Sequence, residues 1–202
     1  MHRLPRAAAP GRAIATPLPI RVRRAVCATL IAFSWPLPAI ADDTPAQAAF
    51  AQLKSLVGEW RGVFPSGREH TVSYRLTAGG STLVETWTLS PTRESMTLYA
   101  LDGDRLLATH YCPQGNQPRL HFDGIDGEGR YRFEFVDGTN LQVADRSHQH
   151  RFWLAFDDAD HYRRAEHYVR NVPSGESSME DAASEDDDAV VYTRIAPDRP
   201  AQ

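Results

Sequence analysis

Residues 95–112 read SMTLYALDGDRLLATHYC, and this stretch carries the pattern that decides the fold class. Two runs rich in β-forming residues, Ser95–Asp102 and Arg105–Cys112, are joined by Asp102-Gly103-Asp104, a sequence typical of a tight turn. A run, a turn and a second run predict a β-hairpin. We therefore expect antiparallel pairing here, and the same pattern extends in both directions along the chain.

Further short β-rich runs follow one another over most of the sequence. Turn signals such as Ala78-Gly79-Gly80 and Asp126-Gly127-Glu128-Gly129 separate many of them. In Tyr131–Phe135, aromatic and charged residues alternate, which favours a strand with one solvated face. The predicted strands are Glu59–Phe64, His70–Thr77, Ser81–Leu89, Ser95–Asp102, Arg105–Cys112, Pro118–Ile125, Arg130–Asp137, His148–Asp158, His161–Val172 and Ala189–Ile195. About ten strands at this spacing predict an all-β domain, either a sandwich or an up-and-down barrel.

A short helix is expected before the first strand. The Thr44 hydroxyl is a suitable N-cap, and Pro45 is tolerated in a first helical turn. The apolar residues that share one helical face are Phe50, Leu53, Leu56 and Val57. Gly58 is the expected end of this helix.

The N-terminal segment has the composition of a secretory signal. Basic residues and no acidic ones precede the apolar run Ala25–Trp35, and Pro38–Ala41 supplies an Ala-x-Ala cleavage site. The run is shorter than the about 20 apolar residues that span a membrane. We expect residues 1–41 to be a cleaved signal peptide and the protein to be periplasmic or secreted, without stable membrane insertion after cleavage. Arg23-Arg24 leaves both the general secretory and the twin-arginine route open.

Residues 42–202 are expected to form one domain. Removing the leader takes away six arginines and leaves 16 basic residues against 26 acidic ones, a net charge of −10. This charge disfavours nucleic acid as a partner. Seven of the acidic residues lie in Pro173–Asp188, which we expect to be a disordered loop before the last strand. Cys112 is then the only cysteine, so no internal disulfide is expected.

Gly58-Glu59-Trp60-Arg61-Gly62, after a short helix and at the start of the first strand, resembles the Gly-x-Trp start of lipocalin-like (calycin) barrels. The resemblance implies that Trp60 closes one barrel end and packs against an arginine of the last strand, for which Arg194 is the candidate. The chain also resembles small secreted bacterial proteins of unassigned function, most strongly in Thr109–Arg119. Together the two resemblances imply a roughly ten-stranded antiparallel lipocalin-like barrel with a short N-terminal helix, and they imply no reaction.

The string Thr109–Arg119 is dense in polar residues. On a strand His110 and Cys112 point to the same side, and a turn follows them. Such residues brace a loop, line the polar mouth of a cavity, or take part in catalysis, and all three interpretations stay open. A hydrolase-like enzyme would use His110 to activate the Cys112 thiol, although no third, orienting group is marked.

His148 and His150 form a second group, because a His-x-His pair on a strand can chelate a metal. Zinc would need further ligands, for which His110, Glu166 and His167 are available. Haem held by a histidine is a related alternative, with candidates His110, His148, His150, His161 and His167. Glu85 and Glu134 are not convincing as a catalytic carboxylate pair, because no spacing brings them together. No cofactor is predicted.

The favoured prediction is a binding protein that holds a small apolar or amphipathic molecule inside the barrel. The expected apolar lining is Leu83 or Val84, Leu98, Phe133, Phe135, Phe152, Leu154 and Phe156. The expected polar rim is His110, Asn116, Arg119, Asn140, His148 and His150. Large aromatic side chains could instead fill the interior completely, and the protein would then be a solid scaffold.

Overall fold

The computed structural model describes residues 43–64, 66–142, 146–170 and 189–196. The chain divides into two units, Met1–Ile40 and Ala41–Gln202, and everything below belongs to the second unit. The predicted signal peptide and the predicted acidic loop lie outside the described residues. No helix within the described ranges is long and apolar enough to span a membrane.

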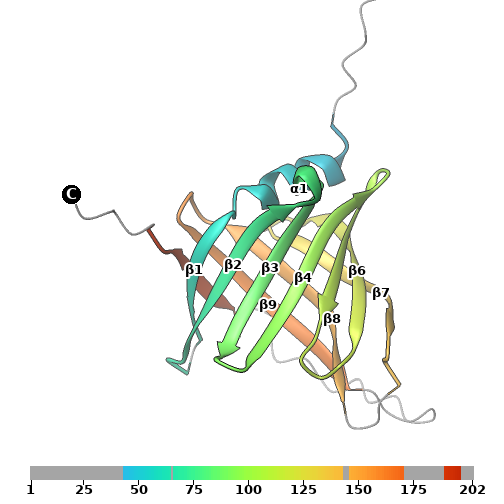
Figure 1. Cartoon of the computed structure of the whole chain (residues 1–202). Helices are drawn as coiled ribbons and strands as arrows, with labels where there is room; N and C mark the ends of the chain where they lie inside the picture. Colours follow the sequence, from blue (N-terminus) through green and yellow to red (C-terminus); the bar gives the residue numbers. More distant parts are fainter. Residues whose placement is uncertain (1–42, 65, 143–145, 171–188, 197–202) are drawn as a thin grey trace, which may run out of the picture. The chain divides into compact units, whose positions relative to one another are not determined.

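One helix and ten strands make up the described domain (Figure 1). The helix is α1 (Pro45–Lys54), and a short 3-10 turn, Ala78–Gly80, joins the second and third strands. The strands are β1 (Gly58–Val63), β2 (Glu69–Thr77), β3 (Thr82–Ser90), β4 (Arg93–Asp102), β5 (Arg105–Tyr111), β6 (Gln117–Ile125), β7 (Tyr131–Thr139), β8 (Ser147–Phe156), β9 (His161–Arg170) and β10 (Val190–Arg194). The all-β class and the short helix are confirmed.

The strands form a closed up-and-down barrel. Each strand pairs antiparallel with its neighbours in sequence, and β10 returns to pair with β1, from Trp60↔Arg194 to Val63↔Val191. Of the two predicted architectures, the barrel is therefore correct and the sandwich is wrong. Closure gives each of the ten strands a hydrogen-bonded neighbour on both sides.

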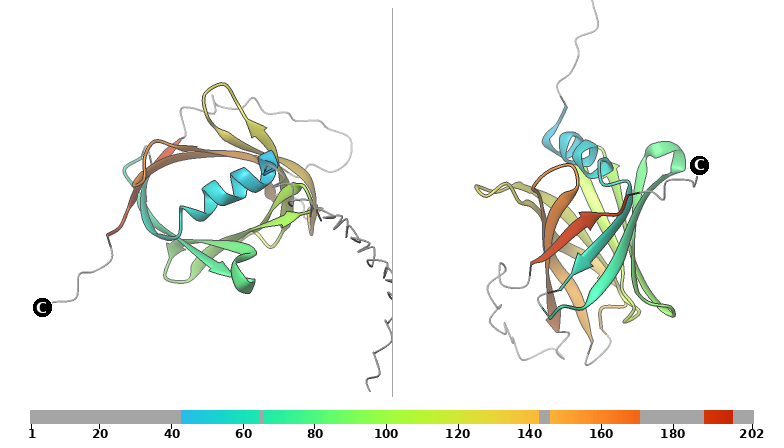
Figure 2. Two further views of the ribbon diagram at one scale, coloured as in Figure 1. Left: turned by 90° about the horizontal axis from the view of Figure 1, so that it is seen from above. Right: turned by 90° about the vertical axis from the view of Figure 1, so that its left-hand side faces the viewer.

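Helix α1 lies across one end of the barrel (Figure 2). Its N-terminus has a capping box. The Gln47 amide donates to Thr44 Oγ1 at 3.2 Å, and the Thr44 amide donates to Gln47 Oε1 at 2.8 Å. The helix ends at Lys54 with Ser55 as its C-cap, so the predicted end at Gly58 is wrong. Val57 consequently lies beyond the helix, where it is exposed, while Phe50 is buried as expected.

Gly58 is the first residue of β1, and its backbone conformation requires glycine. Its φ is +134°, and an added Cβ would lie 3.1 Å from Arg194 Nη1. The Arg194 guanidinium lies 4.1 Å from the centre of the buried Trp60 ring, and it donates to the backbone carbonyls of Ser55, Val57 and Ala159. The Trp60 indole donates to the Leu56 carbonyl at 2.7 Å. These contacts join the helix, the first strand and the last strand at the end that the helix covers.

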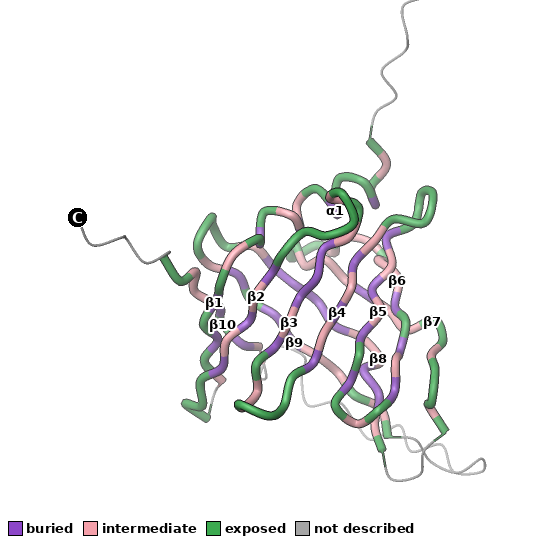
Figure 3. Tube along the Cα trace, in the orientation of Figure 1, coloured by how far each residue is buried: buried purple, intermediate pink, exposed green. Residues whose placement is uncertain are grey.

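The middle of the barrel is filled by side chains, and buried positions alternate with exposed ones along the strands (Figure 3). The rings of Tyr162 and Tyr192 stack at 4.5 Å, and those of Phe133 and Phe152 stack at the same distance. The predicted apolar lining residues Leu83, Phe133, Phe152 and Leu154 all belong to this packed core. Close-packed rings leave no room for a ligand at this level of the barrel.

The inward faces of β3 and β4 settle two details of the predicted lining. Leu83 is in the core and Val84 is not. Leu98 was expected to face inward, and this is wrong: its neighbours Thr97 and Tyr99 are buried inside the barrel, and side chains alternate along a strand. Phe156 packs against the core from its periphery.

Candidate functional site

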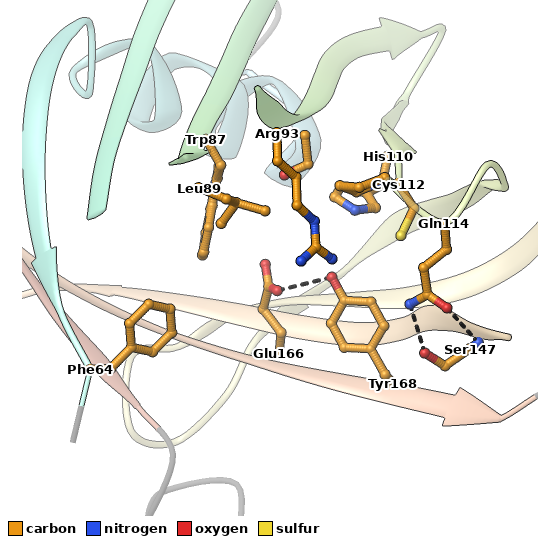
Figure 4. Close-up of a pocket in the computed structure, with 12 residues that line it drawn as sticks. Phe64, Trp87, Leu89, Arg93, His110, Cys112, Gln114, Ser147, Glu166 and Tyr168 are labelled. Atoms are coloured by element: carbon orange, nitrogen blue, oxygen red, sulfur yellow. Dashed lines mark hydrogen bonds between the residues drawn. The ribbon is translucent and has the colours of Figure 1, made fainter. Parts of the chain in front are cut away.

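A cavity of about 270 Å³ lies at the end of the barrel away from α1 (Figure 4). Its walls come from the ends of strands that are far apart in the sequence. The lining residues are Phe64, Trp87, Leu89, Arg93, Ser95, His110, Cys112, Pro113, Gln114, Ser147, Glu166 and Tyr168. A second cavity, of about 290 Å³, adjoins it and shares Phe64, Trp87, Glu166 and Tyr168. The open end of the barrel thus has one hollow region with mixed polar and apolar walls.

A buried ion pair forms the floor below this region. Glu85 on β3 and Arg164 on β9 have almost no exposed side-chain surface, and Arg164 Nη1 lies 2.8 Å and 3.0 Å from the two Glu85 oxygens. Tyr74 donates to Glu85 at 3.2 Å and Tyr99 at 2.5 Å, and the Trp87 indole donates to the same carboxylate. A charge buried in a barrel is tolerated only with such a full set of partners.

Arg164 extends this network to the cavity wall. Its Nε and Nη2 donate to Glu166 Oε1 at 3.0 Å and 2.8 Å, and the Tyr168 hydroxyl donates to Glu166 Oε2 at 3.1 Å. The guanidinium also lies 4.3 Å from the centre of the Phe152 ring. One guanidinium therefore holds two carboxylates, Glu85 in the core and Glu166 at the cavity.

Burial and the neighbouring charges raise the pKa values of the buried tyrosines and of Arg164. Burial, followed by the Glu85 charge, raises the pKa of Tyr74, Tyr99 and Tyr162 well above the ordinary value. Burial alone would lower the pKa of Arg164, but Glu85, Tyr99, Glu166 and Tyr74 together outweigh burial, and the net shift is upward. The tyrosines therefore stay protonated as donors, and Arg164 stays charged.

His110 lines the cavity and has one ring nitrogen without a hydrogen-bond partner among the described residues. The side chain is 3% exposed, and Nδ1 lies 3.0 Å from the Thr97 hydroxyl. Nε2 is buried and has no hydrogen-bond partner among the described residues. Burial lowers the pKa of His110, so the imidazole is neutral at pH 7. A buried polar atom without a partner is costly, and a ligand atom in the cavity would supply the missing hydrogen bond.

The Cys112 thiol lines the same cavity but lacks the features of a nucleophile. Burial raises its pKa, which disfavours the reactive thiolate. The described residues include no hydrogen bond between His110 and Cys112. The geometry consequently gives the hydrolase-like alternative no activated nucleophile.

Two predicted rim residues brace the loop around the β5–β6 turn. Asn116 donates to the Ser147 carbonyl at 2.8 Å, and Gln114 exchanges two hydrogen bonds with Ser147, of 2.9 Å and 3.0 Å. Asn140 donates to the Gly115 carbonyl at 3.3 Å. Asn116 and Asn140 line neither cavity, but Asn116 helps to hold Gln114 and Ser147 in the cavity wall.

Arg119, His148 and His150 also lie outside both cavities. Arg119 pairs with Asp137 on the outer surface at 2.5 Å. His148 Nε2 lies 3.3 Å from His150 Nδ1, and both rings pack against Phe135 next to a β-bulge. Of the predicted rim, only His110 lines the cavity.

The part of the chain that the structure describes offers no ligand set for the alternative metal site. No group of three histidine, cysteine, aspartate or glutamate side chains is placed there to hold a metal ion. His161, a haem candidate, lies 3.0 Å from both Asp158 oxygens near the surface.

Sequence reasoning missed Arg93, Arg164 and Glu166 as cavity or floor residues, and it set Glu85 aside. A signal existed in β9, where Tyr162, Arg164, Glu166 and Tyr168 recur with the period of two that places residues on one strand face. Charged residues at such positions normally indicate the solvated face, so the sequence alone favoured the opposite assignment.

No known protein family has a model that matches this chain, and no curated protein matches it. Among solved structures, the chain is similar to a protein of unknown function from the DUF3598 family of Nostoc punctiforme, at 11% identity and a TM-score of 0.33. The match covers 71% of this chain and 49% of the other, so the chain spans about half the length of that structure. A TM-score of 0.33 is too low to transfer fold details or function.

Proposed function

We propose that this protein is an exported, lipocalin-like barrel that binds one small, partly apolar molecule at its open end. The single observation that carries the proposal is the cavity that His110 lines together with Trp87 and Leu89, where the His110 Nε2 has no hydrogen-bond partner among the described residues. An apolar wall with few converging polar groups is the usual composition of a small-molecule site.

The size of the cavity limits the ligand. Small-molecule sites commonly measure about 300–1,000 Å³. The two adjoining cavities, of about 270 and 290 Å³, lie at the small end of this range. The packed core below them prevents a long chain from entering deeper. The ligand we propose is therefore compact and stays close to the mouth of the barrel, not in its centre.

The lipocalin-like character and the export of the protein belong to the same proposal. The contacts of Trp60 with Arg194 and Leu56 support a lipocalin-like start of the barrel. The composition of residues 1–41 supports export, and a periplasmic or secreted binding protein would meet its ligand outside the cytoplasm.

The test is titration of the purified protein with N-phenyl-1-naphthylamine, an uncharged apolar probe that fluoresces when it leaves water. We expect saturable binding of one probe per chain. Leu89→Trp, at the cavity end of β3, fills the cavity and should abolish binding. The matched variant Leu101→Trp, on the neighbouring strand β4 at the other end of the barrel, should bind as the wild type does. Absence of saturable binding to the wild type, or equal binding by Leu89→Trp, would overturn the proposal.

A further inference from the structure

Two arginines at the open end lack a carboxylate partner. Arg93 lines the first cavity, and its side chain reaches in between His110 and the Glu166–Tyr168 pair (Figure 4). Arg68, in the β1–β2 connection, lies 4.5 Å from the centre of the Phe64 ring, which lines both cavities. Neither guanidinium makes an ion pair with another residue in the described ranges.

Among the charged groups at the cavity and its floor, Arg93 is the one left without an ion pair in the described ranges. Two carboxylates, Glu85 and Glu166, lie with two guanidinium groups, and both carboxylates are paired with Arg164. The two nearby imidazoles add no charge, because burial lowers the pKa of His70 and of His110. The exposed Arg68 adds a positive charge beside Phe64 at the mouth, so a negative charge on a ligand would find an unpaired partner in Arg93.

The carboxylates already present offer little to a positively charged ligand. Glu166 Oε1 accepts two hydrogen bonds from Arg164, and Oε2 accepts one from Tyr168. Glu85 lies below, enclosed by Arg164 and its other donors. An ammonium group would therefore compete for oxygens that are in use and would be repelled by the Arg93 guanidinium in the same wall.

Donors, by contrast, remain available for an anion. The Arg93 guanidinium carries N–H groups in a fork that matches a carboxylate. When the Thr97 hydroxyl donates to His110 Nδ1, the imidazole proton is on Nε2, the nitrogen that has no partner among the described residues. Phe64, Trp87 and Leu89 lie in the same walls and offer apolar surface to the rest of a ligand.

We propose that the cavity binds a compact apolar monocarboxylate, whose carboxylate lies between Arg93 and His110 and whose apolar body packs on Trp87 and Leu89. This inference rests on the proposed function and adds the chemistry of the ligand's head group. Arg68 contributes positive potential at the mouth rather than a required contact.

A matched series of probes tests it by isothermal titration calorimetry at pH 7.5 and low salt: 3-phenylpropanoate, 3-phenylpropanamide and 3-phenylpropylamine. They share one apolar body and carry a negative, a neutral and a positive head group. We expect the carboxylate to bind about tenfold more tightly than the amide, since a charge-assisted hydrogen bond contributes about that much. The amine should bind most weakly.

Variants test whether Arg93 causes the preference for the carboxylate probe. Arg93→Gln should lower the affinity for the carboxylate much more than the affinity for the amide, and so remove most of the tenfold advantage of the carboxylate. The matched control Arg105→Gln, at the first residue of β5 and at the other end of the barrel, should keep this advantage. Equal binding of amide and carboxylate, tightest binding of the amine, or an unchanged preference in Arg93→Gln would overturn this inference. Binding of N-phenyl-1-naphthylamine without binding of any of the three probes would overturn it too, while the proposed function would stand. Absence of all binding would overturn both.

Discussion

Arg164 is the buried cation that stabilises the two carboxylates inside this barrel. It pairs with Glu85 in the core and with Glu166 at the cavity, and three aromatic donors complete the shell of Glu85. Removing one partner of a buried pair leaves an uncompensated charge, and removing both is far less costly.

Glu85→Leu should lower the free energy of unfolding by about 3–5 kcal/mol, because Arg164 and the aromatic donors lose their acceptor. The double variant Glu85→Leu/Arg164→Met should be more stable than the single one. Urea denaturation followed by circular dichroism measures both. The exposed pair Arg119–Asp137 is the control: Asp137→Ala should leave the free energy of unfolding nearly unchanged, because solvent screens an exposed ion pair. A loss as small for Glu85→Leu would contradict the importance of the buried pair.

His110 gives the domain a dependence on pH with a definite sign. Burial lowers the pKa of His110 from 6.5, so the unfolded chain binds a proton more readily than the folded one. Stability is therefore full above about pH 6.5 and falls as the pH drops below it. His70 and His150, whose pKa values are lowered by burial as well, act in the same direction.

The free energy of unfolding of the wild type should accordingly decrease between pH 7 and pH 5, and the decrease should be smaller in His110→Gln. Denaturation curves at several pH values give both slopes. An identical slope in the variant would show that His110 is not held neutral in the folded state.

At the scale of the elements, turn chemistry and residue period made the strands predictable. The ten predicted strands match the observed ones to within one or two residues at each end, because Gly, Asp and Asn mark the turns. The period of two does not show which face of a strand points into the barrel. Leu98 was assigned inward and is not, and the register shift between Gln149 and Arg151 breaks the alternation that placed His148 and His150 at a cavity rim.

Gly62 on β1 shows how tightly neighbouring strands approach. A Cβ at this position would lie 2.5 Å from the His70 ring and 2.6 Å from the Tyr192 ring. Those two side chains also bond to each other, His70 Nε2 to the Tyr192 hydroxyl at 3.0 Å. Glycine is needed here for space, not for its backbone conformation.

Gly62→Ala should therefore lower the free energy of unfolding by about 1–3 kcal/mol, as expected for overpacking. Thermal denaturation monitored by circular dichroism provides the comparison with Gly127→Ala, whose Cβ would meet nothing within 4 Å. Equal melting temperatures for the two variants would contradict the close packing of β1 against β2 and β10.

At the scale of the whole molecule, the barrel has two unlike ends. Helix α1, Trp60 and Arg194 close one end. The cavity lined by Arg93 and His110 lies at the other end. The resemblance through Gly-x-Trp pointed to the closed end, where the sequence is distinctive. The open end was harder to predict, because its residues come from five strands and the chain segments after them, and only folding brings them together.

The predicted signal peptide gives a prediction for the whole chain. Expressed in a bacterium with its N-terminal segment, the protein should be recovered from the periplasm or the medium with residue 42 at its N-terminus, because cleavage is expected after Ala41. The intact mass of the recovered protein measures this. Recovery of the full 202 residues from the cytoplasm would contradict export.

The central claim is that the open end of the barrel is a ligand site. The most direct measurement is an amide ¹H–¹⁵N spectrum of the labelled protein during titration with 3-phenylpropanoate. We predict saturable shifts confined to the residues around Phe64, Trp87–Arg93, His110–Gln114 and Glu166–Tyr168, with the amides of α1 unchanged. Shifts centred on α1, or no saturable shifts at all, would contradict the account.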